Sequence, residues 1–340
     1  MSWLLSNLYD TVGYYTSSFP SVTLTFGNIQ VTTTAQLAEG GYAFVYSAKE
    51  VSGAGRQFAA KKVLVQDAET RAIAETEARL LTEFSGRPNF VVCHGTLVQN
   101  AKSGGAKEHW FLLELCPNGS LIDLLYSKRK GPSGEDEYEP RAALPQELVL
   151  STFASVCTAV CHMHSRQPPV CHRDLKLENV LCRADWSTYV LCDFGSATTA
   201  VLPANRSRKA ALVEQERIER YSTMMYRAPE MVDLHSNLPI DERVDVWALG
   251  CILYSLCFRA HPFPSEGSLQ ILNASYSMPT DSPYAEAVHD LIRSMLTPDP
   301  NLRPSAAYVL RKVKALLGEE VSGSGSSTPA NAPASPRVAP

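Results

Sequence analysis

The amino-acid sequence predicts an α+β protein of two lobes, a small β-rich lobe that contains one helix and a larger, mainly helical lobe. The chain has 340 residues, enough for about two units of ordinary domain size. From about residue 31 to 115, segments rich in β-branched and aromatic residues are separated by glycine-rich turns, a pattern typical of strands. From about residue 120 to 316, longer segments with helical periodicity dominate.

The composition describes a globular protein with a substantial core. Hydrophobic residues make up 45% of the chain and charged residues 19%, which excludes a disordered chain. The formal net charge of −4 excludes a strongly basic nucleic-acid-binding protein, so we expect no nucleic-acid partner. The nine cysteines include no CxxC pair, which indicates reduced thiols in a cytosolic protein.

The sequence predicts no transmembrane segment. Its longest apolar stretch, residues 246–258, is shorter than the roughly 20 residues that a bilayer requires. The first ten residues lack the basic region of a signal peptide, and Ser2 does not fit N-myristoylation. We therefore expect a cytoplasmic protein.

The expected elements follow from these patterns. In the smaller lobe, Ile73, Leu80, Leu81 and Phe84 recur at helical spacing and predict a helix over 67–84. The predicted strands of this lobe cover 32–41, 42–51, 57–65 and 109–115. The predicted helices of the larger lobe cover 121–127, 146–165, 245–258, 282–296 and 305–317.

Three segments differ from the rest of the chain. Residues 127–140 change from basic to acidic around Gly and Pro, which predicts a surface loop. Residues 317–340 are low-complexity Gly, Ser, Pro and Ala, which predicts a disordered tail. Residues 1–30 show no clear period and stay unassigned. The predicted domain is therefore 31–316.

Two short motifs carry the strongest chemical signal. HRDLKLENV occupies residues 172–180, and CDFGSAT follows at 192–198. The first contains H-R-D-L-x-x-x-N and the second D-F-G, which belong to the ordered signature set of protein kinases. The chain therefore resembles a eukaryotic protein kinase. The resemblance implies the bilobal protein-kinase fold, with ATP bound between the lobes.

The resemblance also assigns roles to residues of these motifs. Phosphoryl transfer depends on a positioned nucleophile and on neutralised phosphate charge. Asp174 would orient the substrate hydroxyl and accept its proton, and Lys176 would reach the γ-phosphate. Asn179 and Asp193 would hold Mg²⁺, which prefers oxygen ligands. A lysine at position 176 resembles the serine/threonine branch, so protein Ser and Thr hydroxyls are the expected substrates.

A third motif lies in the smaller lobe. The segment FAAK, which ends at Lys61, resembles the V-A-I-K strand, whose lysine binds the α- and β-phosphates and pairs with a glutamate of helix αC. Glu69, Glu75 and Glu77 compete for this pairing. Leu81 lies four residues after Glu77 and shares its helix face, with the acid toward the lysine and the leucine toward the core. We predict Glu77.

The glycine-rich loop departs from the kinase pattern. With Val45 aligned to the valine of G-x-G-x-x-G-x-V, only Gly40 occupies a glycine position, with Gly41 beside it, while Ala38 and Ala43 replace the others. Small residues still let backbone N–H groups approach phosphates. The nucleotide-binding residues expected in this loop are Leu37, Ala38, Glu39, Gly40, Gly41 and Val45.

The segment FLLELCPNGSL resembles a kinase hinge. Leu113 would be the gatekeeper, and the backbone carbonyl of Glu114 and N–H of Cys116 would meet the adenine edge. Cys192 would border the ATP pocket, either as a small buried residue or as a thiol open to electrophilic ligands. The remaining residues expected at the nucleotide are Ala59, Lys61, Lys176, Glu178, Asn179 and Asp193.

Further residues match the kinase pattern downstream. Thr223 corresponds to the threonine that contacts the catalytic aspartate in serine/threonine kinases. Glu230, which ends the APE motif, would form a buried structural ion pair with Arg303. Asp245 resembles the aspartate that anchors the backbone of the catalytic loop.

The activation segment contains possible regulatory residues. Arg173 precedes the catalytic aspartate, as in kinases whose activation segment is ordered by a phosphate. Ser207 and Ser222 are candidate phosphorylation sites. Five basic residues nearby would either pair with such a phosphate or simply be solvated, and the sequence leaves both readings open. They are Arg206, Arg208, Lys209, Arg217 and Arg220.

Finer features resemble the Numb-associated kinase family, which includes the adaptor-associated and cyclin-G-associated kinases. The segments LAEGGYAFVY, ERYSTMMYRAPEMVDL and VDVWALGCILYSLCF carry this resemblance. It implies an extra helix over 231–238 and an activation segment ordered without phosphorylation. It also implies threonine substrates on clathrin-adaptor subunits and peripheral association with trafficking membranes.

Three functional classes stay open from the sequence. The complete set of catalytic residues favours an active serine/threonine protein kinase. The altered glycine-rich loop is the feature that favours a pseudokinase acting as a binding scaffold. A kinase of small molecules or lipids is disfavoured, because the APE motif and Thr223 point to a peptide substrate.

Overall fold

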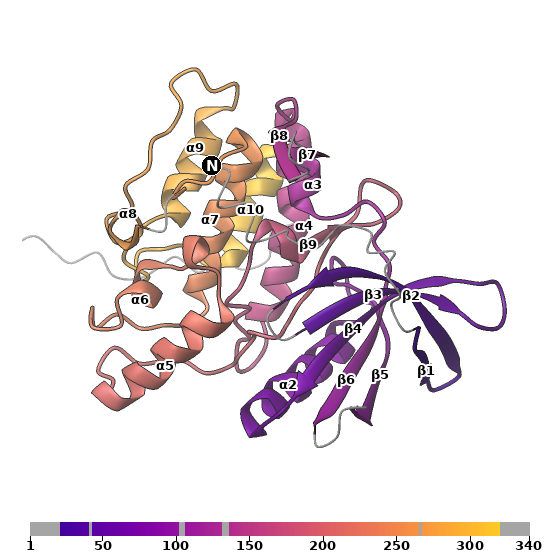
Figure 1. Ribbon diagram of the computed structural model, residues 1–340. Helices are drawn as coiled ribbons and strands as arrows, with labels where there is room; N and C mark the ends of the chain where they lie inside the picture. The colour runs from indigo at the N-terminus through magenta and orange to yellow at the C-terminus, as the bar shows by residue number, and fades with distance from the viewer. Residues whose placement is uncertain (1–20, 41–42, 102–105, 131–135, 265–266, 320–340) are drawn as a thin grey trace, which may run out of the picture.

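A six-stranded antiparallel sheet forms most of the smaller lobe of the computed structural model, and helices form most of the larger lobe (Figure 1). The structure describes residues 21–40, 43–101, 106–130, 136–264 and 267–319. The sheet order is β1-β2-β3-β4-β6-β5. These strands are β1 (Thr23–Phe26), β2 (Ile29–Glu39), β3 (Ala43–Glu50), β4 (Gln57–Val65), β5 (Cys93–Asn100) and β6 (Lys107–Glu114). Two further antiparallel pairs are β7 (Tyr126–Lys130) with β8 (Asp136–Pro140) and β9 (Val180–Cys182) with β10 (Tyr189–Leu191).

The two faces of the main sheet contribute to separate apolar clusters. Along β4, Phe58 and Ala60 belong to one cluster, and Val63 and Val65 belong to the other. This alternation follows from the two-residue period of a strand. The second cluster includes buried residues of α2 (Ala68–Phe84) and continues into the larger lobe. The two lobes therefore share one continuous core.

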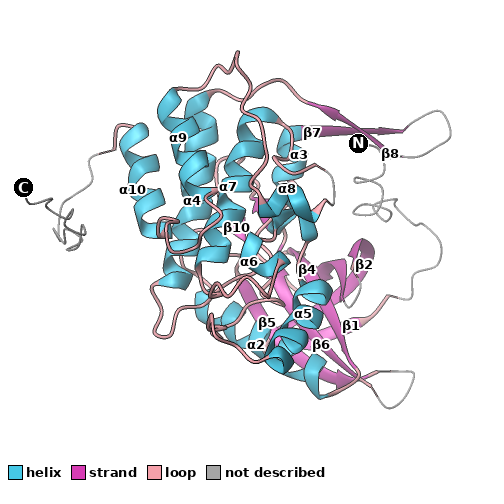
Figure 2. Cartoon of the chain, turned by 90° about the vertical axis from the view of Figure 1, so that its left-hand side faces the viewer, coloured by secondary structure: helices cyan, strands magenta, loops and turns pink. Residues whose placement is uncertain are grey.

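Helix α7 (Arg243–Phe258) is buried within the larger lobe, and the other helices are arranged around it (Figure 2). Every residue from 244 to 257 is buried, which explains the long apolar stretch in the sequence. At Gly250 an added Cβ would lie 2.8 Å from Cδ2 of Leu296, so only glycine permits this close approach. The surrounding helices include α3 (Leu121–Leu125), α4 (Gln146–His164), α8 (Ser268–Leu272), α9 (Glu286–Met295) and α10 (Ala306–Leu316).

The surface loop expected over 127–140 is instead largely the β7–β8 hairpin. Opposite charges face each other across the two strands. Arg129 Nε lies 3.1 Å from Oε2 of Glu137, and its Nη1 lies 2.8 Å from Oε1 of Glu139. The change from basic to acidic residues therefore supports strand pairing, and the prediction of a loop was wrong.

A helix of the activation segment, α5 (Arg208–Tyr221), was not predicted. Ser207 begins it, because its Oγ accepts the N–H of Ala210 at 3.2 Å. Ala211 and Ile218 are buried and lie seven residues apart, on one face of the helix. This helix precedes the APE motif.

The extra helix expected over 231–238 is not formed there. The only helical turn at that point is α6 (Pro229–Val232), together with turns and bends over 234–236. The carboxylate of Asp233 accepts the N–H of His235 at 2.9 Å, which favours a turn over a continuing helix. The prediction placed the extra helix on the wrong side of the APE motif.

The ends of the domain are seen in part. β1 and the start of β2 lie before residue 31. Leu24 and Phe26 of β1 are buried in the same apolar cluster as Phe58 and Ala60. The range that the sequence left unassigned thus contributes an edge strand. Helix α10 ends at Leu316, and the predicted tail from residue 320 onward lies outside the described residues.

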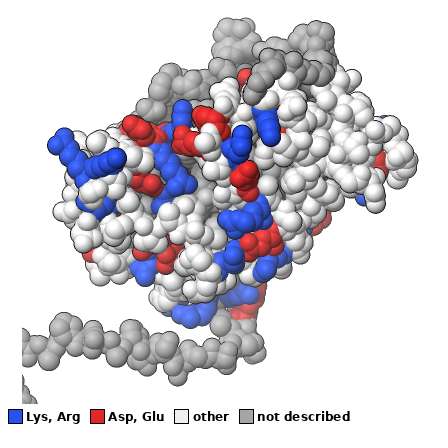
Figure 3. All heavy atoms as spheres, turned by 90° about the horizontal axis from the view of Figure 1, so that it is seen from below, with Lys and Arg blue, Asp and Glu red and all other residues white. Residues whose placement is uncertain are grey.

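The surface carries both signs of charge. On the face shown in Figure 3, basic and acidic side chains intermingle in a band, and neither sign forms one large patch. Among the helices of the described residues, none is long and apolar enough to cross a membrane.

Candidate active site

Lys61 of β4 joins the two lobes at the candidate nucleotide site. Its Nζ lies 2.6 Å from Oε1 of Glu77 in α2 and 2.8 Å from Oδ1 of Asp193. Lys61 and Glu77 are buried. Of the three candidate glutamates, Glu77 is the one that contacts the lysine, whereas Glu69 contacts Arg220 of α5.

Local sequence patterns place both charges in the interior. Glu77 lies in the buried stripe of α2, which also contains Ala74 and Leu81. Lys61 shares its face of β4 with Val63, two residues along the strand. A buried charge costs free energy unless it is paired. Glu77 and Lys61 each lie among apolar residues and face each other as an ion pair. Because such burial is costly, this arrangement indicates a functional pair.

Mutual attraction keeps Lys61 and Asp193 ionised. Burial alone would lower the pKa of Lys61, but the charges of Asp193 and Glu77 raise it above its usual value. Burial would also raise the pKa of Asp193, yet the Lys61 charge and hydrogen bond hold it below its usual range. The site therefore presents a positive lysine and a negative aspartate at neutral pH.

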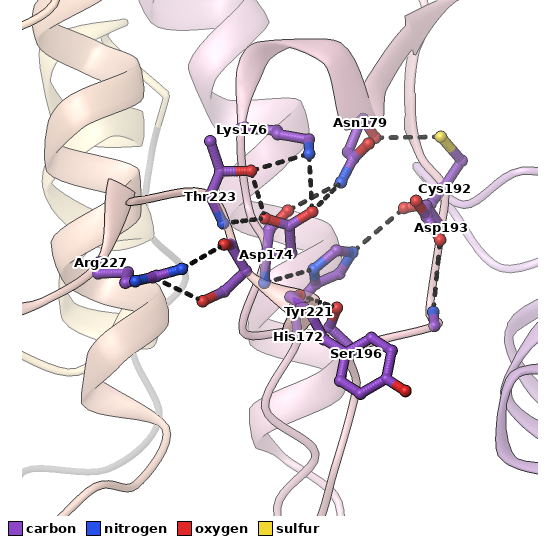
Figure 4. Close-up of polar contacts among 12 residues, drawn as sticks. His172, Asp174, Lys176, Asn179, Cys192, Asp193, Ser196, Tyr221, Thr223 and Arg227 are labelled. Carbon is purple, nitrogen blue, oxygen red and sulfur yellow. Dashed lines mark hydrogen bonds and ion pairs between the residues drawn. The ribbon is translucent and has the colours of Figure 1, made fainter. Parts of the chain in front are cut away.

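Asp174 is the centre of a hydrogen-bonded network in the catalytic loop (Figure 4). Its Oδ1 accepts the backbone N–H of Thr223 at 3.0 Å and the Thr223 hydroxyl at 2.8 Å. Its Oδ2 lies 2.8 Å from Nζ of Lys176, which also donates to Thr223 Oγ1 at 2.9 Å. These contacts hold the carboxylate in one orientation.

Asn179 and Asp193 supply oxygen donors that suit Mg²⁺. Asn179 Nδ2 donates to the backbone carbonyl of Asp174 at 2.8 Å, so its amide oxygen is the donor left for a cation. The Asp193 side chain is 44% exposed although Lys61 holds one of its oxygens. Magnesium is commonly held by one or two side chains plus substrate phosphates. This donor set fits that pattern, and the described residues contain no larger cluster of metal-binding side chains.

Asp245 of α7 anchors the catalytic loop. Its Oδ2 accepts the backbone N–H of His172 at 2.7 Å, and its Oδ1 accepts that of Arg173 at 2.8 Å. Nε2 of His164 lies 2.9 Å from Oδ2. Burial would raise the pKa of Asp245, but the hydrogen bond and charge of His164 help to lower it. These contacts hold Arg173 in a left-handed backbone conformation, with φ of 65°.

Phe194 links α2 to the catalytic loop. Its ring is buried, with its centroid 5.6 Å from that of His172 and 5.8 Å from that of Phe84 in α2. His172 is fully buried, and its Nε2 lies 3.1 Å from the carbonyl of Cys192. Such packing places Asp193 between Lys61 and the catalytic loop.

The predicted phosphate loop corresponds to the β2–β3 hairpin. Ala38 lies opposite Val45, and Gly40 N–H donates to the carbonyl of Ala43 at 2.8 Å. Gly41 lies outside the described residues. The predicted loop residues that the structure describes are Leu37, Ala38, Glu39, Gly40 and Val45. Their contact with the nucleotide stays a prediction.

The predicted hinge is held by an ion pair that the sequence did not predict. Glu114 binds Arg183 through two hydrogen bonds of 2.8 and 2.7 Å and accepts the N–H of Val92 at 2.8 Å. Ala59 and Leu113 lie opposite each other in β4 and β6. A carboxylate paired with arginine by two bonds is strongly oriented. No local spacing links Glu114 to Arg183, which lies 69 residues away.

Burial raises the pKa of three other predicted nucleotide-site residues, Cys116, Cys192 and Glu178. Burial raises the pKa of the Cys116 thiol to about 12 and also raises that of Cys192. Both thiols therefore stay protonated, which favours the packing role of Cys192 over a reactive one. Burial also raises the pKa of Glu178, and its Oε2 has no hydrogen-bond partner among the described residues.

Three contacts of the activation segment were also missed from the sequence. The Arg173 guanidinium donates to Oε1 of Glu214 in α5. The Ser196 hydroxyl, just after the DFG motif, donates to the backbone carbonyl of Tyr221 at the end of α5. Arg227 Nη2 donates to the carbonyl of Ser222 at 2.8 Å. The capping serine and the apolar spacing of α5 could have predicted the helix, but not these contacts with distant residues.

Two of the five basic residues near the candidate phosphorylation sites are already partnered. Arg206 donates to the backbone carbonyls of Leu234 at 2.9 Å and Leu238 at 2.7 Å. Arg220 lies 3.3 Å from Oε2 of Glu69. Burial lowers the pKa of Arg206. These contacts tie Arg206 to residues 234–238 and Arg220 to α2.

Glu230 and Arg303 form a fully buried ion pair away from these groups. Arg303 Nη1 lies 2.8 Å from Oε1 of Glu230, and Nη2 lies 3.0 Å from Oε2. Both side chains are 0% exposed. Arg303 also donates to the carbonyls of Thr297 and Arg243, so the pair ties the APE motif to the larger lobe.

Comparisons with known proteins agree with this geometry. The protein kinase domain family matches residues 31–313. A probable serine/threonine-protein kinase of Dictyostelium discoideum is 36% identical over 294 residues, which is 86% of this chain and 35% of that protein. A second one from the same organism is 33% identical over 298 residues, covering 88% of this chain and 25% of that protein.

A fungal relative gives a similar match. The protein kinase domain-containing protein ppk38 of Schizosaccharomyces pombe is 36% identical over 297 residues, which is 85% of this chain and 44% of that protein. This chain thus spans between a quarter and just under half of the length of these relatives. The chain belongs to the protein kinase family.

Proposed function

We propose that the chain is an active serine/threonine protein kinase that transfers the γ-phosphate of ATP to Ser and Thr hydroxyls of proteins. The observation that carries this proposal is the Lys61 ammonium shared by Glu77 and Asp193, with Nζ–O distances of 2.6 and 2.8 Å. It joins a strand, a helix and the DFG motif across the two lobes. An active kinase requires this lysine–glutamate pair and the DFG aspartate to be in place together.

Different residues of the chain would supply the proton acceptor, the positive charge and the metal ligands for the transfer. Asp174 would accept the proton as the substrate hydroxyl oxygen forms its bond to the γ-phosphorus, while the bond to the β-phosphate oxygen breaks and ADP leaves. Lys176, held 2.8 Å from Asp174, would neutralise charge on the transferred group. Mg²⁺ held by Asn179 and Asp193 would supply further positive charge at the phosphates.

The choice of serine or threonine is supported by the position of Thr223. Its hydroxyl contacts both Asp174 and Lys176, at 2.8 and 2.9 Å. This places the activation segment directly against the catalytic carboxylate, beside the point at which a peptide hydroxyl would enter. The curated relatives named as probable serine/threonine-protein kinases support the same assignment.

The finer assignment is membership of the Numb-associated kinase family. It is supported by the sequence segments LAEGGYAFVY and ERYSTMMYRAPEMVDL. On this basis the substrates would include threonines of clathrin-adaptor subunits, and the protein would be cytoplasmic with peripheral association with trafficking membranes. A phosphoproteomic comparison of cells that express the wild type or Asp174→Asn tests it. A set of dependent sites without adaptor subunits would contradict the adaptor role.

The activity itself is tested with purified protein, Mg·ATP and a generic Ser/Thr peptide. We expect turnover by the wild type and a loss of about 10³-fold or more in kcat for Asp174→Asn, because that change removes the proton acceptor. Glu216→Gln, an exposed acid on α5, is the matched control and should keep the wild-type rate. Absence of turnover by the folded wild type, or equal turnover by Asp174→Asn, would contradict the proposal. Absence of turnover would support a pseudokinase scaffold.

A further inference from the structure

Arg173, the residue just before Asp174, has a buried guanidinium that needs a negative partner. Its side chain is 5% exposed. Its backbone is fixed by Asp245, as described above, and its Nη2 donates to the carbonyl of Ala200 at 3.0 Å. A neutral carbonyl does not balance a buried positive charge. The charge is balanced by Glu214 of α5, whose Oε1 accepts from Nη1.

An arginine in this position often receives a phosphate when a kinase is switched on, and the new contact orders the activation loop. Here a carboxylate of the chain itself occupies that position. The Glu214 side chain is only 12% exposed, so the pair is largely shielded from water and from salt. Arg217, one turn further along α5, lines the same small cavity as Arg173. Without Glu214, two positive groups would be left beside each other.

The helix that carries Glu214 leads directly to the catalytic carboxylate. Its last residue, Tyr221, accepts a hydrogen bond from Ser196 through its backbone carbonyl. Two residues later, Thr223 bonds to Oδ1 of Asp174 through its N–H and its hydroxyl. The contacts at Glu214 and at Thr223 therefore both join one continuous segment to the catalytic loop.

The candidate phosphorylation sites are already engaged in other contacts. Ser207 Oγ caps the start of α5 by accepting the N–H of Ala210. Ser222 Oγ donates to the carbonyl of Ile218 at 2.6 Å and accepts from Arg227 Nε at 3.0 Å. Neither hydroxyl is hydrogen-bonded to Arg173, although Ser222 lines the same small cavity as Arg173 and Arg217. Both hydroxyls therefore already take part in hydrogen bonds that hold this segment.

We propose that Glu214 is a positioning residue that takes the place of an activating phosphate. Its carboxylate neutralises Arg173 and holds α5 on the catalytic loop, so that Thr223 stays on Asp174. This inference rests on the proposed kinase activity for its effect on rate. Its effect on the order of the activation segment does not depend on that activity.

Glu214→Gln tests the proposal because it removes the charge and keeps the shape. We expect kcat for a peptide to fall about tenfold or more, as for the loss of a hydrogen bond between charged groups. We expect KM for ATP to change little, since Lys61 and Asp193 are untouched. Glu216→Gln, two residues along the same helix and exposed, should match the wild type.

Coupling to Arg173 separates a positioning role from a general structural one. In an Arg173→Ala background, Glu214→Gln should cause no further loss of kcat, because both changes remove the same contact. A wild-type kcat for Glu214→Gln, or an equal further loss in the Arg173→Ala background, would overturn the proposal.

Hydrogen exchange gives a readout that does not need activity. We expect amides of residues 208–227 to exchange faster in Glu214→Gln than in the wild type or in Glu216→Gln, while amides of α7 stay protected. Unchanged exchange over 208–227 would overturn the proposal even if the wild type proved inactive. An inactive wild type with the expected exchange would instead contradict the proposed function and leave the positioning contact supported.

Discussion

Two carboxylates hold the catalytic loop, and they do so in different ways. Asp245 lies in the buried helix α7, is 1% exposed, and binds the loop through backbone N–H groups. Glu214 lies on α5, and holds only the side chain of Arg173. The first contact is part of the core and forms whenever the domain folds. The second depends on where one surface segment lies, so it is the contact through which activity can be adjusted without unfolding.

Of the variants that test this comparison, we expect the largest loss of stability from a change at Asp245. Asp245→Asn replaces one accepting oxygen by an N–H₂ group and leaves a buried donor facing another donor. Since the lost bonds involve a charged acceptor, we expect a destabilisation of about 3 kcal/mol or more, or a Tm lower by at least about 6 °C. Thermal unfolding followed by circular dichroism measures it.

The contrast with Glu214 sharpens that result. Asp245→Asn should lower both Tm and kcat, whereas Glu214→Gln should lower kcat with a much smaller change in Tm. Equal changes in Tm for the two variants would remove the distinction between a core contact and an adjustable one.

We expect the smallest change in kcat from a substitution in the surface ion pair between α5 and α2. Arg220 and Glu69 lie 3.3 Å apart, but their side chains are 46% and 53% exposed. Because such surface pairs contribute about 0–1 kcal/mol, Arg220→Ala should change kcat by less than about fivefold. Steady-state kinetics at low and high salt measure this. A loss as large as that of Glu214→Gln would show that α5 acts through α2 as much as through the catalytic loop.

The parts of the site that the sequence predicted are those with local or motif-based signals. Glu77 was predicted from its helical spacing with Leu81, and Asp174, Asn179 and Asp193 lie in two contiguous motifs. The Glu230–Arg303 and Asp245 contacts followed from the same family pattern. These positions are defined by short stretches of chain, so they can be found without knowing the tertiary structure. Their roles in binding and catalysis stay predictions.

Other features depend on contacts between distant segments. Glu214 lies 41 residues from Arg173, and Glu114 lies 69 residues from Arg183. Neither pair has a spacing that a helix or strand would impose. The helix expected over 231–238 was wrong because Asp233 favours a turn there, and the loop expected over 127–140 was wrong because its opposite charges pair across a hairpin. The two ion pairs are tertiary contacts, whereas the two wrong elements were decided by short-range contacts within their own segments.

The central claim is that a carboxylate of the chain, and not a phosphate, holds the activation segment on the catalytic loop. The most direct test is kcat of the purified wild type before and after phosphatase treatment, with intact mass used to verify that no phosphate remains on residues 196–230. Because Glu214 already neutralises Arg173, the phosphate-free protein should have the same kcat as the untreated protein. A loss of activity on dephosphorylation, restored by rephosphorylation of this segment, would contradict the claim.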